Sequence, residues 1–357
     1  MFKKSKILTA SMAMVLALGI LVTGCGTSTE PTTSSEGTNE QATVDEQITI
    51  GFSLPTLREE RYQKDRDQFI ATAEGLGAEV LVQAANNDEA LQKSQVENLI
   101  TQGIDVLVLD PQNAESAADL VDMAHEAGIK VISYDRLIKN SDVDYYISFD
   151  NEQVGRLQGE YITTQVPKGN YFVFAGAPTD NNATLFKKGA MEYIQPLVDK
   201  GDIKILYEQA VKDWQPEEAL KLAENALTVN NNQVDAILAP NDGTAGGIIQ
   251  ALEAQKLAGE VVITGQDAEL AAAKRIVAGT QSMTVYKDVK TLAAKSAELA
   301  VAIAKGEDVS GQVNGTVNNG KIDVPSILLD PVVVTKDNLD SVLIDGGWFT
   351  KEQVYGQ

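Results

Sequence analysis

The feature that most constrains the fold is a regular alternation, from Gln47 onwards, of short β-branched runs with amphipathic helical stretches. The first runs are Ile48–Leu54 and Glu79–Gln83. The stretch between them places Phe69 and Leu76 on one helical face and ends at Gly77. Such alternation is typical of parallel sheets covered by helices on both faces. The sequence therefore predicts an α/β fold.

The same rhythm restarts after a predicted strand at Tyr145–Phe149. A chain of 357 residues is also long for one compact core. We therefore expect two Rossmann-like lobes, each a parallel sheet flanked by helices. The expected boundaries are 46–151 plus 287–312 for the first lobe, 152–286 plus 313–345 for the second, and 346–357 for a tail.

The carboxyl end carries one more helix, ended by Gly306, and one more strand at Ile327–Val334. These elements would let the chain cross between the lobes again. Several crossings form a hinge that permits an opening motion and resists twisting. We expect the two lobes to be joined by such a multi-strand hinge.

The amino terminus has the features of a signal peptide. Three lysines precede an apolar run, Ile7–Val22, that is too short for a comfortable membrane span. The stretch from Val22 to Cys25 resembles a bacterial lipobox, which predicts a lipoprotein signal peptide at 1–24 and lipid on the Cys25 sulfur. The alternative is an ordinary signal peptide with an incidental cysteine. Cys25 is the only cysteine, so no intramolecular disulfide forms.

Residues 25–45 are rich in Ser, Thr, Gly and Glu and predict a flexible tether. Without the three lysines of residues 1–24, the chain carries 26 basic and 51 acidic residues, a net charge of −25. This charge repels nucleic acid and anionic lipid. We therefore expect no nucleic-acid partner and attachment to the outer face of the bacterial cell membrane through lipid.

Polar and aromatic side chains follow the predicted strands of both halves. Asp135 and Arg136 stand directly after the strand Ile129–Tyr134. Ligands in open parallel sheets bind beyond the carboxyl ends of the strands. The other residues in such positions are Arg58, Arg61, Tyr62, Lys64, Asp180, Asn181, Asn182, Trp214, Asn241, Asp242, Asp267 and Lys287.

Each of these positions also has an ordinary structural explanation. Asp135 could cap a turn while Arg136 pairs with it on the surface, and a single Asp or Asn here is often a helix N-cap. We assign Asp88 and Asp242 to that role. Trp214 could be a core residue, but its sequence neighbours are polar, which favours a binding role.

The combination of residue types suits a sugar. Ring hydroxyls both donate and accept hydrogen bonds, so carboxylates together with Arg, Asn or Lys satisfy them in both senses. The apolar face of a sugar packs on an aromatic ring, a role open to Trp214 and Tyr62. The sequence predicts a site for a small polyhydroxylated ligand.

Several stretches carry a resemblance to a known family. They are REERYQKDRDQF, YYISFDNEQVG, NNATLFKKGAM, NDGTAGG, GQDAEL and AGTQSMTVYKDV. These stretches closely resemble the ribose/galactose-type (type I) periplasmic sugar-binding proteins of bacterial ABC importers. The resemblance covers the chain from Ile48 to near its end. It implies two Rossmann-like lobes joined by three strands, with a monosaccharide, D-xylose, held in the cleft.

The resemblance also implies the sugar contacts. They would be Arg61, Asp135, Arg136, Asp180, Asn182, Trp214, Asn241, Asp267 and Lys287, with Lys64 added from the same motif as Arg61 and Tyr62 as a stacking residue. The family usually has Trp where this chain has Tyr62, which keeps a flat face and adds a hydroxyl.

The implied function is capture of D-xylose by lobe closure and delivery to an ABC permease that works with a separate ATPase. The chain has no GxxxxGK[ST] loop of its own. We expect a monomer without cofactor or metal. Two alternatives keep the same site: a xylose-sensing partner of a membrane kinase or chemoreceptor, and a binder of another pentose or hexose.

An enzyme is the competing class, with Asp135, Asp180 and Asp267 as acid and base of a glycosidase. The nearby cations and amides are suited to keeping these carboxylates ionised, whereas a catalytic acid needs a raised pKa. No GxSxG motif is present, and the single histidine, His125, has no Cys or His companion for zinc. We therefore expect a binding protein and not an enzyme.

Overall fold

The computed structural model describes residues 47–356. The predicted signal peptide, the predicted lipid modification of Cys25 and the predicted tether lie outside these described residues. The strands are β1 Thr49–Leu54, β2 Glu79–Ala84, β3 Val106–Leu109, β4 Lys130–Tyr134, β5 Tyr145–Phe149, β6 Gly169–Ala175, β7 Ile203–Ala210, β8 Ala236–Leu238, β9 Val262–Ile263, β10 Met283–Tyr286, β11 Gly315–Asn318, β12 Asp323–Leu329 and β13 Val332–Thr335.

The helices alternate with these strands as predicted. They are α1 Glu60–Gly75, α2 Glu89–Thr101, α3 Ala118–Glu126, α4 Asn151–Gln165, α5 Asn181–Asp199, α6 Pro216–Val229, α7 Asp242–Ala254, α8 Leu270–Ala278, α9 Val289–Ala304 and α10 Lys351–Tyr355, with short helical turns at Lys212–Trp214, Ser310–Gln312 and Asp340–Ile344. The glycine predicted to end the first helix, Gly77, has φ 87°, a conformation that glycine adopts without steric cost.

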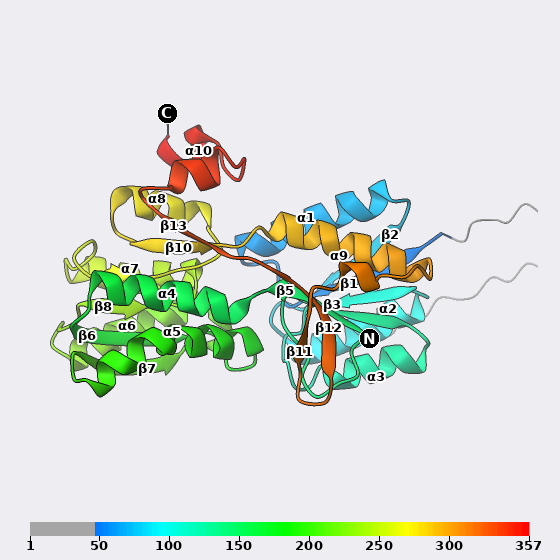
Figure 1. Cartoon of the computed structure of the whole chain (residues 1–357), viewed down its shortest axis with the longest axis horizontal. Helices are drawn as coiled ribbons and strands as arrows, with labels where there is room; N and C mark the ends of the chain where they lie inside the picture. Colours follow the sequence, from blue (N-terminus) through cyan, green and yellow to red (C-terminus); the bar gives the residue numbers. More distant parts are fainter. Residues whose placement is uncertain (1–46, 357) are drawn as a thin grey trace, which may run out of the picture. The chain divides into compact units, whose positions relative to one another are not determined.

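The first lobe is built on a seven-stranded sheet of order β11-β12-β5-β4-β3-β1-β2. Its strands are parallel except β11, which runs antiparallel to β12. Side chains alternate between its faces: Val106 and Val108 of β3 join the core under α1 and α9, while Leu107 and Leu109 join the core under α2 and α3. Figure 1 shows α1 and α9 together on one face of this sheet.

The second lobe is built on a parallel four-stranded sheet of order β7-β6-β8-β9. Tyr171 and Val173 of β6 pack with residues of α4 and α5, while Phe172 and Phe174 pack with residues of α6 and α7. Helices therefore cover both faces of both sheets. The predicted α/β fold with two Rossmann-like lobes is confirmed.

The chain passes between the lobes three times. It leaves the first sheet after β5, returns after β10 to form α9, and leaves again between β12 and β13. β10 and β13 pair antiparallel as a two-stranded sheet, with Met283 opposite Thr335. The described residues thus contain the three connecting segments that were expected.

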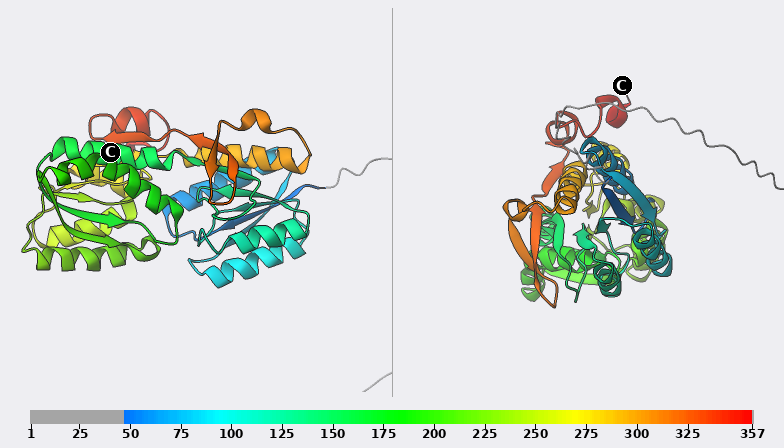
Figure 2. Two further views of the ribbon diagram at one scale, coloured as in Figure 1. Left: turned by 60° about the horizontal axis from the view of Figure 1, so that its bottom comes forward. Right: turned by 90° about the vertical axis from the view of Figure 1, so that its right-hand side faces the viewer.

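The expected boundaries at the carboxyl end are wrong in one respect. The segment 313–345 was assigned to the second lobe, but β12 pairs with β5 and extends the first sheet, with β11 on its outer edge (Figure 2). Among the strands of this segment, only β13 pairs with a strand outside the first sheet. The amphipathic pattern of a strand does not specify which sheet it joins.

The segment expected to be a tail is packed into the protein. Trp348 and Phe349 are each 6% exposed and belong to the core that contains α1 and α9. α10 packs against α8. Within residues 47–356, no helix has the length and apolar character needed to span a membrane.

Candidate functional site

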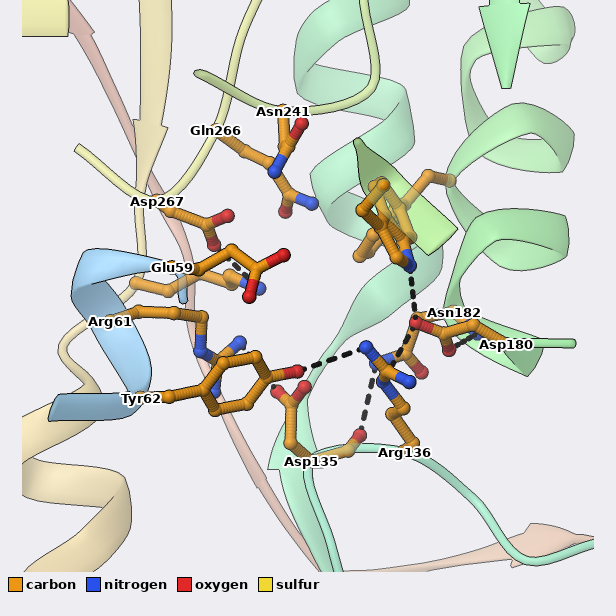
Figure 3. Close-up of a pocket in the computed structure, with 13 residues that line it drawn as sticks. Glu59, Arg61, Tyr62, Asp135, Arg136, Asp180, Asn182, Asn241, Gln266 and Asp267 are labelled. Atoms are coloured by element: carbon orange, nitrogen blue, oxygen red, sulfur yellow. Dashed lines mark hydrogen bonds and ion pairs between the residues drawn. The ribbon is translucent and has the colours of Figure 1, made fainter. Parts of the chain in front are cut away.

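Residues from both lobes line one cavity at the carboxyl ends of the strands (Figure 3). Ten of the eleven predicted ligand-binding residues lie there. The lining consists of Glu59, Arg61, Tyr62, Asp135, Arg136, Asp180, Asn182, Phe186, Trp214, Asn241, Gln266, Asp267 and Lys287. The free volume of the cavity is only about 30 Å³, so the side chains of the two lobes lie close together.

Asp135 lies between the two lobes and is buried. Its Oδ1 is 3.0 Å from Nη1 of Arg61, which comes from the start of α1. Its backbone has φ 55°, and its carbonyl accepts hydrogen bonds from the Ser148 hydroxyl at 2.7 Å and from Nδ2 of Asn182 at 3.1 Å. Asp135 and Arg136 are 2% and 4% exposed, so the alternative of a surface turn is wrong. The hydrogen bonds to its carbonyl hold the backbone of Asp135 in the left-handed conformation, which directs the carboxylate into the cavity.

Arg136 connects the first lobe to the second. Its Nε is 3.0 Å from Oδ2 of Asp180 and 3.6 Å from Oδ1 of Asp110. Its Nη2 donates to the Tyr62 hydroxyl at 3.0 Å. The guanidinium therefore contacts Asp180 of the second lobe while Tyr62 orients it from the first.

Two predicted binding residues are also helix caps. Asp180 caps α5 by accepting from the backbone N–H of Asn182 at 2.8 Å, and its other oxygen accepts from Nε1 of Trp214 at 3.2 Å. Asn241 caps α7 by accepting from the N–H of Thr244 at 3.0 Å. The capping and site roles thus coexist, because a cap at a strand end is already at the cavity edge.

The two residues assigned only to capping differ in outcome. Asp88 caps α2, as predicted. Asp242 does not cap α7, because Asn241 does; its carboxylate accepts from the Thr284 hydroxyl at 2.8 Å and from the N–H of Glu269 at 3.0 Å. Asp242 therefore fixes the loop that carries Asp267.

Asp267 and Lys287 form an ion pair of 3.0 Å at the opposite wall. Lys287 is 2% exposed, and its ammonium lies 5.5 Å from the centre of the Phe186 ring and 5.8 Å from that of Phe149. Asp267 has φ 90° and follows Gln266, whose Oε1 is buried without a hydrogen-bond partner among the described residues.

Trp214 provides the largest aromatic surface of the cavity. It has φ 55° and follows Asp213 at φ 49°, so its loop is held in an unusual backbone conformation. A methyl group at Gly176 would overlap the Trp214 ring, so glycine at this position makes room for the indole. The Phe186 ring meets Trp214 edge-on, with ring centres 6.3 Å apart.

Lys64 is the predicted ligand-binding residue that the structure places elsewhere. Its ammonium pairs with Glu60 at 2.6 Å and lies over the rings of Trp348 and Phe349. Burial, the largest influence, lowers its pKa. Although Lys64 is one helical turn from Arg61, its side chain points to the C-terminal segment and not to the cavity.

Three lining residues were not predicted: Glu59, Phe186 and Gln266. Phe186 lies one helical turn after Asn182, so helical spacing from that residue could have indicated it. Gln266 and Glu59 lie next to or near predicted residues, but the sequence does not show that they face the cavity. Glu59 points into its centre in Figure 3.

The charges of the site are tuned by burial and by each other. Burial alone would raise the pKa of Asp135, but Arg61, Lys287 and Arg136 together hold it below its ordinary value. Burial raises the pKa of Asp180, assisted by Asp135 and opposed by Arg136. Burial also raises the pKa of Tyr62 well above its usual range, so this hydroxyl stays protonated. The pKa of Asp180 therefore shifts in the opposite direction to the one expected for a carboxylate held by nearby cations.

The arrangement offers alternating acceptors and donors around an aromatic surface. Four carboxylates, three amides and three cations face one small space, which suits a ligand with several hydroxyls. Among residues 47–356, no group of three or more His, Cys, Asp or Glu side chains is placed to hold a metal ion. His125 lies in α3, away from the cavity, and contacts Asp144 at 2.8 Å.

Known proteins are similar to this chain in sequence and in fold. The family model described as a periplasmic binding protein domain matches residues 50–308. The D-xylose-binding periplasmic protein of Haemophilus influenzae is 52% identical over 308 residues, which cover 86% of this chain and 92% of that protein. The protein of the same name from Escherichia coli is 53% identical over 307 residues, with the same two coverages.

A solved structure extends the likeness to three dimensions. A carbohydrate transporter solute binding protein from Chloroflexus aurantiacus, in complex with D-glucose, has a TM-score of 0.81 and 36% identity, covering 86% of this chain and 98% of that chain. These relatives are solute-binding proteins and not enzymes. The chain belongs to the periplasmic binding protein family, an extracytoplasmic class of solute-binding proteins.

Proposed function

We propose that this chain is the substrate-binding lipoprotein of a bacterial ABC sugar importer and that its ligand is D-xylose. The observation that carries the proposal is the convergence of charged side chains from both lobes on one cavity, where Arg61 meets Asp135 and Arg136 meets Asp180. The identity of 52–53% to D-xylose-binding periplasmic proteins supports the choice of sugar.

Capture works by lobe closure. Arg61, Asp135 and Arg136 belong to the first lobe, whereas Asp180, Asn241 and Asp267 belong to the second. Only a form with the lobes together brings both sets to one ligand, so binding lowers the free energy of the closed form. Because the free volume is small, a sugar enters when the lobes are apart. Its hydroxyls then replace the hydrogen bonds and ion pairs that the side chains of the cavity make with each other in the absence of sugar.

The contacts are sufficient for useful affinity. A micromolar dissociation constant corresponds to about −8 kcal/mol. Hydrogen bonds to charged groups contribute roughly 1.5–3 kcal/mol each. Several such bonds, together with stacking on Trp214, reach this value after the cost of ordering the ligand and the lobes.

Calorimetry of the full-length protein in detergent tests the proposal. The titrants are D-xylose, D-ribose, L-arabinose, D-glucose and D-galactose. We expect D-xylose to bind in the micromolar range or tighter, and more tightly than the other sugars. No heat with any of them would overturn sugar binding.

The second candidate ligand is another pentose or hexose. It is favoured by the Chloroflexus aurantiacus neighbour, whose structure contains D-glucose. The same titrations separate the two: tighter binding of D-glucose than of D-xylose would replace the ligand and leave the transport role unchanged.

The proposal includes a lipid anchor on Cys25 and delivery to a membrane permease. The sequence from Val22 to Cys25 supports the anchor. Mass spectrometry of the membrane-bound protein should show diacylglycerol on Cys25, and Cys25→Ser should release the protein from membranes. Xylose uptake by cells that carry the permease should fall when this chain is deleted and return when it is restored.

A further inference from the structure

We propose that Glu59 is a sugar-contacting residue that sets specificity, its Oε2 accepting a hydrogen bond from one sugar hydroxyl while its Oε1 holds Arg58. This inference rests on the proposed sugar-binding function. Glu59 lines the cavity, and its side chain is 12% exposed. Figure 3 shows it directed to the centre of the cavity, between Asp267 and Tyr62 in this view.

The two carboxylate oxygens of Glu59 have different surroundings. Oε1 accepts a hydrogen bond from Nη2 of Arg58. Oε2 is buried and has no hydrogen-bond partner among the described residues. A buried acceptor without a partner costs free energy, so a ligand hydroxyl that donates to Oε2 recovers it.

Helix capping does not account for this orientation. Glu59 is the N-cap residue of α1, but its side chain makes no capping hydrogen bond. The carboxylate is turned away from the helix end and into the cavity. Gln266 also has a buried oxygen without a partner, but its amide can rotate to donate instead. Glu59, when ionised, can only accept, which makes it the more selective group.

Arg58 links Glu59 to the opposite lobe. The same Nη2 that contacts Glu59 donates to the backbone carbonyl of Asp213 at 2.8 Å. Asp213 precedes Trp214, whose indole lines the cavity. A hydroxyl bound at Glu59 is therefore held beside a contact that exists only when α1 and the Trp214 loop are together.

Selectivity follows from the cost of leaving Oε2 unpaired. A site built to bind one hydroxyl discriminates strongly against an analogue that lacks it, because the buried acceptor then has no partner. The six other carboxylate and amide side chains of the lining are Asp135, Asp180, Asn182, Asn241, Gln266 and Asp267, and all but Gln266 were predicted contacts. Glu59 adds a carboxylate acceptor to that set.

The test compares wild type and Glu59→Gln, which keeps the shape of the side chain and replaces one carboxylate oxygen with an NH2 group. Because Arg58 can only donate, it retains the amide oxygen, and the NH2 group takes the position of Oε2. Calorimetry uses D-xylose, each of its monodeoxy analogues, and D-glucose, which adds a hydroxymethyl group. If Glu59 binds a pentose hydroxyl, Glu59→Gln lowers the affinity for D-xylose at least about tenfold. The affinity for the one analogue that lacks this hydroxyl is then the same in the variant as in wild type. If Glu59 binds the hydroxymethyl group, only the affinity for D-glucose falls.

Two further variants separate specificity from general damage. Glu74→Gln changes an exposed carboxyl on the same helix and should bind all the sugars as wild type does. Arg58→Ala removes the contact with Asp213. It should lower the affinity for every sugar by a similar factor, smaller than the loss expected for Glu59→Gln. A uniform change, or one below threefold for every sugar with Glu59→Gln, would overturn the role of Glu59. A wild-type protein that binds none of the sugars would overturn the proposed function itself.

Discussion

The ammonium of Lys64 lies 3.9 Å from the centre of the Trp348 ring, and the indole N–H of Trp348 donates to the Ala268 carbonyl at 2.9 Å. Lys64 belongs to α1 of the first lobe, and Ala268 follows Asp267 in the second. The C-terminal segment therefore contacts both lobes, next to residues of the cavity. This contact explains why Lys64 is absent from the cavity itself.

Replacing Trp348 by alanine should destabilise the protein. The side chain is 6% exposed, so its removal loses buried apolar area and the cation–π contact together. We expect the free energy of unfolding to fall by about 3 kcal/mol. Trp348→Phe keeps an aromatic ring without the N–H and should lose about 1 kcal/mol. Urea denaturation measures both, and a loss below about 1 kcal/mol for Trp348→Ala would contradict this role.

The two lysines at positions 64 and 287 should differ in their effect on sugar binding. Lys287→Met leaves the buried Asp267 without its ion-pair partner, so affinity for D-xylose should fall by about 2 kcal/mol or more. Lys64→Met keeps a side chain of similar length at a position outside the cavity. It should change the free energy of D-xylose binding by less than about 0.5 kcal/mol. Calorimetry on both variants measures this, with circular dichroism to verify folding. Equal losses would mean that Lys64 takes part in binding after all.

Gly176→Ala should weaken sugar binding through Trp214. The added methyl group overlaps the indole, so the ring must move from its place in the cavity wall. We expect affinity to fall about tenfold or more, since stacking on an aromatic ring and its hydrogen bond to Asp180 are both disturbed. Gly75→Ala, at a helical position with open space, is the matched control and should bind normally. Trp214 fluorescence should report the displacement, and an unchanged affinity in Gly176→Ala would contradict it.

Stability should fall as pH rises, in part through Glu269. Burial, reinforced by Asp242, Asp267 and Glu60, raises the pKa of Glu269 from 4.5 to about 8. Because the folded state holds this proton more tightly than the unfolded state, the associated stability is present below about pH 4.5 and is lost as pH rises through about 8.

Glu269→Gln, which cannot ionise, should reduce this dependence. Between pH 5 and 8, wild type should lose about 3.5 kcal/mol more of its unfolding free energy than the variant does. Denaturant titrations at the two pH values measure the difference, with Glu74→Gln as an exposed control. Parallel pH profiles for wild type and Glu269→Gln would show that this carboxyl does not titrate in that range.

Much of the fold and of the candidate site was predictable from local pattern. The repeated strand and helix periods predict two α/β lobes, because each period depends on which side chains face the core. The same pattern places Asp135, Asp180 and Asn241 after strands, and the carboxyl ends of parallel strands meet at one edge. Ten predicted residues accordingly line one cavity.

The sequence by itself determined the elements, their order and the chemical types gathered at the strand ends, since these follow from interactions between near neighbours in the chain. Only the tertiary structure decided that β12 joins the first sheet, that Arg136 pairs with Asp180 and not with Asp135, that Lys64 faces Trp348, and that Glu59 faces the cavity. Each of these depends on contacts between residues distant in sequence, and on side-chain directions that the period of one element does not specify.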